Sequence, residues 1–183
     1  MGKRVLFVVG SLRRGSFNRV LAEAAARIVG ERAEVAFLDF ADVPFMNQDI
    51  EFPPPASVTR VRAEVTAADA LWICSPEYNH AIPAQLKNTL DWLSRPLVAG
   101  DYATPRPLTA KPVALSGAGG KMGTADGRAQ LEELLVRLGS CPVAGAGEGF
   151  PLPPETWATG VYEPSADDLG RLAAQAEVLL AAL

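Results

Sequence analysis

Short, continuous apolar runs at wide intervals are the feature of this sequence that most constrains its fold. They occupy residues 5–9, 35–38, 70–74 and 113–115. A strand that alternates apolar and polar residues has one wet face, whereas a strand that is apolar throughout is buried on both faces. The runs therefore predict the inner strands of a parallel sheet.

Amphipathic helical patterns separate these runs. They cover residues 17–29, 58–68, 84–93 and 128–138, and a last helix is expected from a capping box of Ser165 and Asp168 to Leu183. Pro83 suits the first turn of the helix at 84–93. With a further strand starting near Cys141, strand and helix alternate about five times. Parallel neighbours need right-handed crossovers that cover both faces, so the pattern predicts a doubly wound α/β sandwich.

The length of 183 residues suits a single domain over 1–183. The Pro-rich stretch 51–57 is similar to a linker, but too little chain precedes it to form a domain. We interpret residues 39–57 as one long loop after the second strand. Residues 145–164 are rich in Gly and Pro and are expected to form an ordered but irregular excursion before the last helix.

Charge and composition exclude several partners. A net charge of -4 with scattered Lys and Arg argues against nucleic-acid binding. No apolar run approaches the ~18 residues of a membrane span, and the start of the chain does not suit a signal peptide. Cys74 and Cys141 have neither disulfide nor metal-ligand spacing, so we interpret both as buried small hydrophobes in a reducing compartment. A soluble, cytoplasmic protein is expected.

Ligands of open parallel sheets bind beyond the carboxyl ends of the strands. Three unusual segments follow strands there: GSLRRGSFN at 10–18, SPEYNHAIP at 75–83 and SGAGGKMGT at 116–124, named below the first, second and third loops. The first loop combines short polar side chains and two arginines with a helix start, which suits a phosphate. It matches neither the Walker loop nor the dinucleotide glycine pattern. The ligand is therefore expected to be a mononucleotide other than ATP or GTP, and the plain alternative is a solvated turn.

The second loop is bracketed by Pro76 and Pro83, which stiffen the turn between them. A flat, partly polar ring could lie against it, covered by Tyr78. The alternatives are that Tyr78 is an ordinary packed aromatic and that Glu77 is the dipole partner of the next helix. In the third loop, four glycines allow the backbone to approach a planar ligand, although such a segment can also be merely flexible.

These three loops together resemble the NADPH-dependent FMN reductases, the flavodoxin-like group of quinone, azo-dye and chromate reductases. The resemblance covers roughly residues 3–143, and its most specific part is the PEYN-x-x-IP-x-x-LKN-x-x-DW pattern at 76–92. It implies a five-stranded parallel sheet of order 2-1-3-4-5 with helices on both faces. It also implies bound FMN and a hydride donor, NADPH or NADH. The implied FMN contacts are Ser11, Arg13, Ser16 and Asn18 for the phosphate, Pro76, Glu77, Tyr78 and Asn79 along the ring, and Ser116, Gly117, Gly119 and Gly120 at the pyrimidine edge.

Where relatives often have a compact glycine turn, this chain carries Lys121 and an inserted-looking Ala125-Asp126-Gly127. The FMN ring would carry the chemistry, so no catalytic acid or base and no metal is expected. Lys121, together with backbone amides of the third loop, would stabilise negative charge on the reduced ring. The acceptor would be a small molecule such as a quinone, an azo compound, a metal oxyanion or free flavin.

The resemblance further implies a homodimer or homotetramer, formed through the helix at 84–93. That helix is expected to have more apolar surface than one sheet face needs, with Trp92 as a simple core residue the alternative. An electron carrier with the same three loops and no NADPH-dependent turnover of its own is the other function left open. His80, the only histidine, is expected to be solvated or at an interface, because no nucleophile accompanies it.

Overall fold

The protein is described by a computed structural model that covers residues 2–183. Its centre is a parallel sheet of order β2-β1-β3-β4-β5, with a sixth strand, β6, also paired to β4. The strands are β1 Arg4–Val9, β2 Glu34–Phe37, β3 Ala70–Cys74, β4 Pro112–Gly119, β5 Cys141–Pro142 and β6 Glu148–Pro151. The predicted flavodoxin-like strand order is confirmed.

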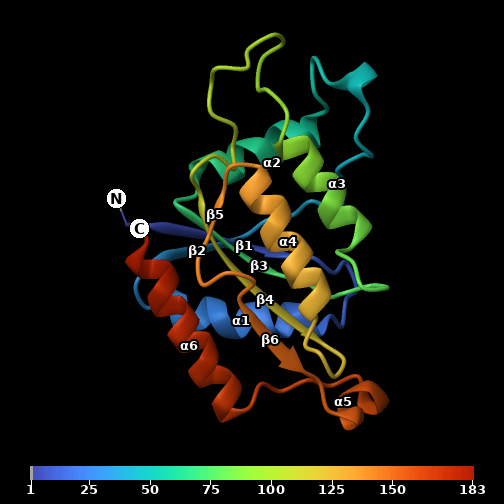
Figure 1. Ribbon diagram of the computed structural model, residues 1–183, viewed down its shortest axis with the longest axis vertical. Helices are drawn as coiled ribbons and strands as arrows, with labels where there is room; N and C mark the ends of the chain where they lie inside the picture. The colour runs from blue at the N-terminus through green and yellow to red at the C-terminus, as the bar shows by residue number, and fades with distance from the viewer. Residues whose placement is uncertain (1) are drawn as a thin grey trace.

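Helices cover both faces of this sheet (Figure 1). They are α1 Phe17–Val29, α2 Ala56–Ala67, α3 Ala84–Leu93, α4 Ala125–Arg137, the short α5 Pro154–Thr159 and α6 Ala166–Ala181. α1 and α6 pack on one face, and α2, α3 and α4 on the other. None of the helices in residues 2–183 combines the length and the apolar character that crossing a bilayer requires.

Alternate residues of each central strand fill the two cores. Phe7 of β1 faces α1 and stacks on Trp72 of β3, with ring centroids 5.5 Å apart. Leu6 faces the opposite core beside α2 and α3. Both residues are fully buried, as expected for a strand covered on both sides.

The fifth position of the sheet is divided between two short strands. β5 pairs with the start of β4 at Pro112 and Val113, whereas β6 pairs with its end from Ser116 to Gly119. Residues 145–164, expected to be irregular, thus contain β6 and α5, and the expectation was wrong in this respect. The predicted capping box of α6 is present, since Ser165 and Asp168 each accept the backbone N–H of the other.

Two expectations about single side chains are also corrected. Cys74 is buried as predicted, but Cys141 is exposed, because β5 is an edge strand of only two residues. The large apolar residues of α3, namely Leu86, Leu90, Trp92 and Leu93, are all buried within this chain, so the helix offers no surplus apolar face. Trp92 is a core residue, 1% exposed, whose Nε1 donates to the carbonyl of Pro44 over 2.8 Å and holds the long loop against α3.

Candidate functional site

The first, second and third loops meet at the carboxyl ends of β1, β3 and β4, where Ser75 is the point of closest approach. A Cβ on Gly10 would lie 2.7 Å from Ser75 Oγ, and one on Gly117 would lie 2.7 Å from the carbonyl oxygen of Ser75. Gly10 also donates its N–H to the carbonyl of Cys74 over 2.8 Å. Glycine is required at both positions because any side chain would separate neighbouring strand ends.

The first loop presents free backbone donors at the start of α1. The N–H groups of Leu12, Arg14 and Gly15 have no acceptor among residues 2–183. Ser16 is the N-cap of α1, and its Oγ accepts the N–H of Arg19 over 3.3 Å. Free amides at an electropositive helix end are the donor set that a phosphate monoester needs, so the residues present fit the phosphate of FMN.

The side chains of Arg13 and Asn18 lie on different sides of this helix start. Arg13 folds back over it: its Cζ lies 4.6 Å from the centroid of the Phe17 ring. Asn18 is buried and turned inward. Its amide donates to the carbonyl of Ala118 and its carbonyl accepts the N–H of Ala118, both over 2.9 Å. Asn18 therefore joins the first loop to β4, and its side-chain polar atoms are already engaged within the protein.

The second loop is a tight turn whose tip is Asn79 and His80. Both have left-handed φ, 53° and 60°, and Tyr78 and Ala81 exchange two backbone hydrogen bonds across them. Asn tolerates this region better than most residues. Pro76 is buried below the turn and the Tyr78 side chain is exposed, so Tyr78 is not an ordinary core aromatic.

Glu77 belongs to the start of α4 rather than to α3. Its Oε2 accepts the N–H of Gly127 in the first turn of α4 over 2.8 Å. The segment Ala125-Asp126-Gly127, taken from the sequence as an insertion in the third loop, is this first turn. The alternative interpretation of Glu77 as the dipole partner of α3 is wrong about the helix, because Glu77 is nearer to α3 only along the chain.

The third loop is shorter than expected because β4 continues through most of its glycines. Ser116 lies inside β4, where its Oγ donates to Gln175 over 2.6 Å and accepts from Trp72 Nε1 over 2.9 Å. Gly117 and Gly119 lie in the strand against the Thr124 side chain. Gly120 is exposed at the strand end, with open space on its Cα. Of these four residues, only Gly120 presents a free surface in the turn itself.

A pocket of about 420 Å³ is lined in part by the first loop, and a pocket of about 250 Å³ lies between the second and third loops. The smaller, called here the ring pocket, is lined by Pro76, Glu77, Tyr78, Ala118, Gly119, Gly120, Lys121, Met122, Thr124 and Trp157. Thr124 Oγ1 is buried there without a hydrogen-bond partner. An aromatic mouth, an unpaired hydroxyl and a nearby cation fit a flat ring with one polar edge.

Trp157, like Thr124, is a residue of this pocket that sequence reasoning missed. It comes from α5, is 58% exposed, and packs edge-on against Phe17 with ring centroids 5.4 Å apart. The signal was present, since a tryptophan in a Pro-rich stretch has no core pattern around it. Nothing local in the sequence, however, shows that residue 157 reaches the ends of β3 and β4.

His80 is solvated, as expected, and forms an ion pair beside the ring pocket. Its Nδ1 lies 2.6 Å from Asp126 Oδ2 and 3.8 Å from Glu77 Oε1. The hydrogen bond to Asp126, with the charges of Asp126 and Glu77, raises the pKa of His80 above its ordinary value. The stability that this pair contributes is therefore present below the unfolded-state pKa of ~6.5 and is lost as the pH rises through the folded-state pKa.

An NMR pH titration of the single imidazole is expected to give a midpoint above that of a free histidine. Asp126→Asn should return the midpoint toward ~6.5, because the partner that stabilises the protonated ring is removed. Glu133→Gln, on the same helix but paired to Arg137, is the matched control and should leave the midpoint unchanged. A wild-type midpoint at or below ~6.5 would contradict the ion pair.

Comparisons with known proteins agree with this geometry. Residues 3–148 match the family model described as NADPH-dependent FMN reductase. The chain is 37% identical over 144 residues to the NAD(P)H-dependent FMN reductase of Pseudomonas aeruginosa, covering 76% of this chain and 73% of that protein. It is 35% identical over 139 residues to a quinone reductase of Escherichia coli K12, covering 74% and 70%.

Among solved structures, the chain is similar to FerB, the flavoenzyme NAD(P)H:(acceptor) oxidoreductase of Paracoccus denitrificans. The TM-score is 0.82 at 27% identity, with 98% of each chain covered. The fold, the loop geometry and the family match thus agree on one family, and FMN and a nicotinamide dinucleotide are the cofactors. This chain belongs to the NADPH-dependent FMN reductase family of oxidoreductases.

Proposed function

We propose that the protein is an FMN-dependent oxidoreductase that takes a hydride from NAD(P)H and passes two electrons to a small-molecule acceptor, of which a quinone fits best. The main support is that free amides at the α1 start and an aromatic ring pocket lie at the same sheet edge. Two relatives are named quinone reductases, one from Escherichia coli and one from Burkholderia for 2-hydroxy-1,4-benzoquinone.

In this proposal the amides of the first loop and Arg13 hold the phosphate, and the residues from Pro76 to Asn79 lie along the ring. When bound, FMN supplies the group that accepts the hydride and releases the electrons. The chain supplies binding, orientation and charge. Thr124 offers its unpaired hydroxyl to the polar edge of the ring, and Ser11, Ser16 and Asn18 shape the turn around the phosphate.

The visible spectrum of the purified protein tests this function. A flavin spectrum that bleaches on anaerobic addition of NADPH, and returns on addition of benzoquinone, is the expected result. Stopped-flow bleaching by NADPH also separates the enzyme from the alternative, a flavodoxin-like carrier, which would bind FMN and bleach only with a separate reductase. A protein that takes up no added FMN would refute both.

Lys121 lines the ring pocket and is proposed to stabilise negative charge on the reduced ring. Lys121→Met should lower the two-electron midpoint potential by about 10–30 mV, because an exposed charge contributes only modestly. Spectroelectrochemistry gives the potential. The exposed Lys3→Met, at the far end of β1, is the control, and equal potentials in all three proteins would remove Lys121 from the proposal.

Trp157 is proposed to form the wall that receives an aromatic acceptor. Trp157→Ala should lower kcat/KM for benzoquinone about threefold to tenfold, since one aromatic pair contributes that much, while Trp157→Phe keeps most of it. The rate of NADPH oxidation in the reductive half-reaction is the internal control. An equal loss in both half-reactions would indicate a damaged flavin site instead of an acceptor wall.

A homodimer or homotetramer and a cytoplasmic location complete the proposal. Free thiols at Cys74 and Cys141 are consistent with a reducing compartment. Light scattering after size-exclusion chromatography would give the mass as a multiple of 19.4 kDa.

A further inference from the structure

The larger pocket, called here the arginine cavity, lies on the other side of β1 from the ring pocket. Its volume is about 420 Å³, and it is lined by Val9, Ser11, Leu12, Arg13, Arg14 and Arg19 and by Phe37, Leu38, Asp39, Phe40 and Ala41. These residues come from the first loop, from α1 and from the end of β2, which borders β1 opposite to β3. Ser11 and Arg13 also belong to the proposed phosphate site, whereas the ring pocket shares no residue with this cavity.

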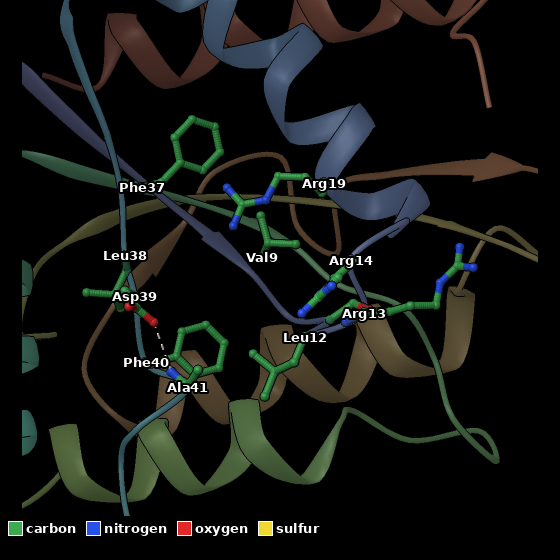
Figure 2. A pocket seen from close by; sticks show the side chains of 11 residues that line it. Val9, Leu12, Arg13, Arg14, Arg19, Phe37, Leu38, Asp39, Phe40 and Ala41 are labelled. Carbon is green, nitrogen blue, oxygen red and sulfur yellow. Dashed lines mark hydrogen bonds between the residues drawn. The ribbon is translucent and has the colours of Figure 1, made fainter. Parts of the chain in front are cut away.

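Two guanidinium groups enter the cavity without an anionic partner. Figure 2 shows Arg14 and Arg19 reaching into the space between the first loop and the segment after β2. Within residues 2–183, neither has a carboxylate oxygen within 4.0 Å, whereas Arg95 and Arg171, for example, pair with Glu51 and Glu148. Arg19 is held in place by Phe37, with its Cζ 4.7 Å from the ring centroid.

The adjacent arginines Arg13 and Arg14 point to different places. Arg13 extends away from the centre of the cavity toward Phe17 and the start of α1 (Figure 2). Arg14 extends into the cavity on the side of Leu12 and Phe40, whereas Arg19 extends toward Phe37 (Figure 2). One guanidinium is thus available to the phosphate proposed for FMN, and two remain for a second anion.

The position of the cavity relative to the sheet indicates which kind of molecule carries that anion. In Rossmann folds, which are doubly wound sheets of another strand order, the adenosine ribose of a bound dinucleotide lies beyond the end of the second strand, where an acid contacts its 2′-hydroxyl or an arginine accommodates a 2′-phosphate. β1 and β2 are neighbours here as well, so the comparison with the Rossmann fold is one of position. Here Asp39 follows β2 by two residues, with its Oδ1 fixed by the N–H of Ala41 over 3.1 Å. Arg14 and Arg19 face it across the cavity.

The walls of the cavity also suit the uncharged part of an adenosine. Leu12, 55% exposed, gives the cavity an apolar side next to its charged side. A guanidinium pair recognises a phosphomonoester through bidentate hydrogen bonds, which a ribose hydroxyl cannot match.

We propose that the arginine cavity binds the 2′-phosphoadenosine end of NADPH, with Arg14 and Arg19 on the 2′-phosphate and Asp39 on the neighbouring ribose hydroxyl. The inference rests on the proposed function and deepens it, since it makes NADPH the preferred donor and names the residues that set the preference.

Calorimetric titration with 2′-AMP tests the site without turnover. The wild-type protein should bind 2′-AMP at least about tenfold more tightly than adenosine. Arg14→Gln and Arg19→Gln should each reduce 2′-AMP affinity about tenfold and leave adenosine affinity unchanged. Asp39→Asn should strengthen 2′-AMP binding severalfold, because it removes the like charge beside the phosphate.

Steady-state kinetics give the second measurement. Both arginine variants should lower kcat/KM for NADPH about tenfold to hundredfold. For Arg19→Gln, at a residue outside the proposed FMN site, kcat/KM for NADH and the FMN affinity measured by flavin fluorescence should stay within twofold of wild type. Arg32→Gln, an arginine at the far end of α1 paired with Glu177, is the matched control and should change none of these values.

Three outcomes would overturn the inference: equal affinity of the wild type for 2′-AMP and adenosine, an equal loss with NADPH and NADH, or a loss of FMN affinity in the Arg14 and Arg19 variants that exceeds the loss of 2′-AMP affinity. Failure of the proposed function has a different signature. In that case the wild type oxidises neither dinucleotide, and the 2′-AMP titration still decides the site.

Discussion

Gly117→Ala is expected to destabilise the protein by about 3 kcal/mol or more and to abolish FMN binding. A Cβ at this position would lie 1.8 Å from Thr124 Oγ1 and 2.7 Å from the carbonyl oxygen of Ser75. The Thr124 side chain would have to change its rotamer, and the Ser75 carbonyl belongs to the backbone beside β4 and cannot move without displacing the strand end. Urea unfolding followed by circular dichroism gives the change in the free energy of unfolding.

Gly120→Ala is the matched control for this substitution, since Gly120 belongs to the same glycine run and has no atom within 4 Å of an added Cβ. It should change stability by less than about 0.5 kcal/mol. Adding Thr124→Ala to Gly117→Ala should recover part of the loss by removing the hydroxyl from the contact. If Gly117→Ala and Gly120→Ala unfold at the same urea concentration, the close approach of the two loops is wrong.

Asn18→Ala is expected to cost about 2–4 kcal/mol, because the buried N–H and carbonyl of Ala118 would both lose their partner. The same side chain joins the start of α1 to the end of β4, so its loss should also weaken FMN binding at least tenfold. Denaturant unfolding and flavin fluorescence titration measure the two effects separately.

Asn47→Ala provides the corresponding control, since Asn47 is exposed and its side chain accepts only the N–H of Asp49 over 2.9 Å. It should cost less than about 1 kcal/mol and leave FMN affinity unchanged. Asn18→Asp keeps the acceptor for the Ala118 N–H but sets a carboxylate against the Ala118 carbonyl, so it should rescue little. Stability like that of the wild type in Asn18→Ala would show that the bridge is dispensable.

The sequence predicts the inner sheet and most of its helices because burial on both faces leaves a local pattern. The runs at 5–9 and 70–74 coincide with β1 and β3 to within a residue, and the helix at 84–93 coincides with α3. Strand ends next to the site were harder to predict. The end of β4 resembles a flexible glycine loop, yet Gly117 and Gly119 lie in the strand because Thr124 packs on them.

The candidate site, too, could be predicted only where its residues are close together in the sequence. The first and second loops could be recognised from contiguous residues, whereas Trp157 and Arg19 contribute through contacts that only the tertiary structure creates. β6 and α5 were missed for a related reason. Their residues are rich in Gly and Pro, and β6 exists because the end of β4 needs a neighbour for its backbone hydrogen bonds.

The division of the fifth sheet position between β5 and β6 also bears on self-association. A long, straight outer strand is a template onto which another chain can add its own strand. Here the outer margin is a two-residue strand containing Pro142, then a bulging segment with left-handed glycines, then a strand ending at Pro151. This margin offers no continuous row of free backbone groups, so copies of the protein that meet on this side must do so through side chains and not by extending the sheet.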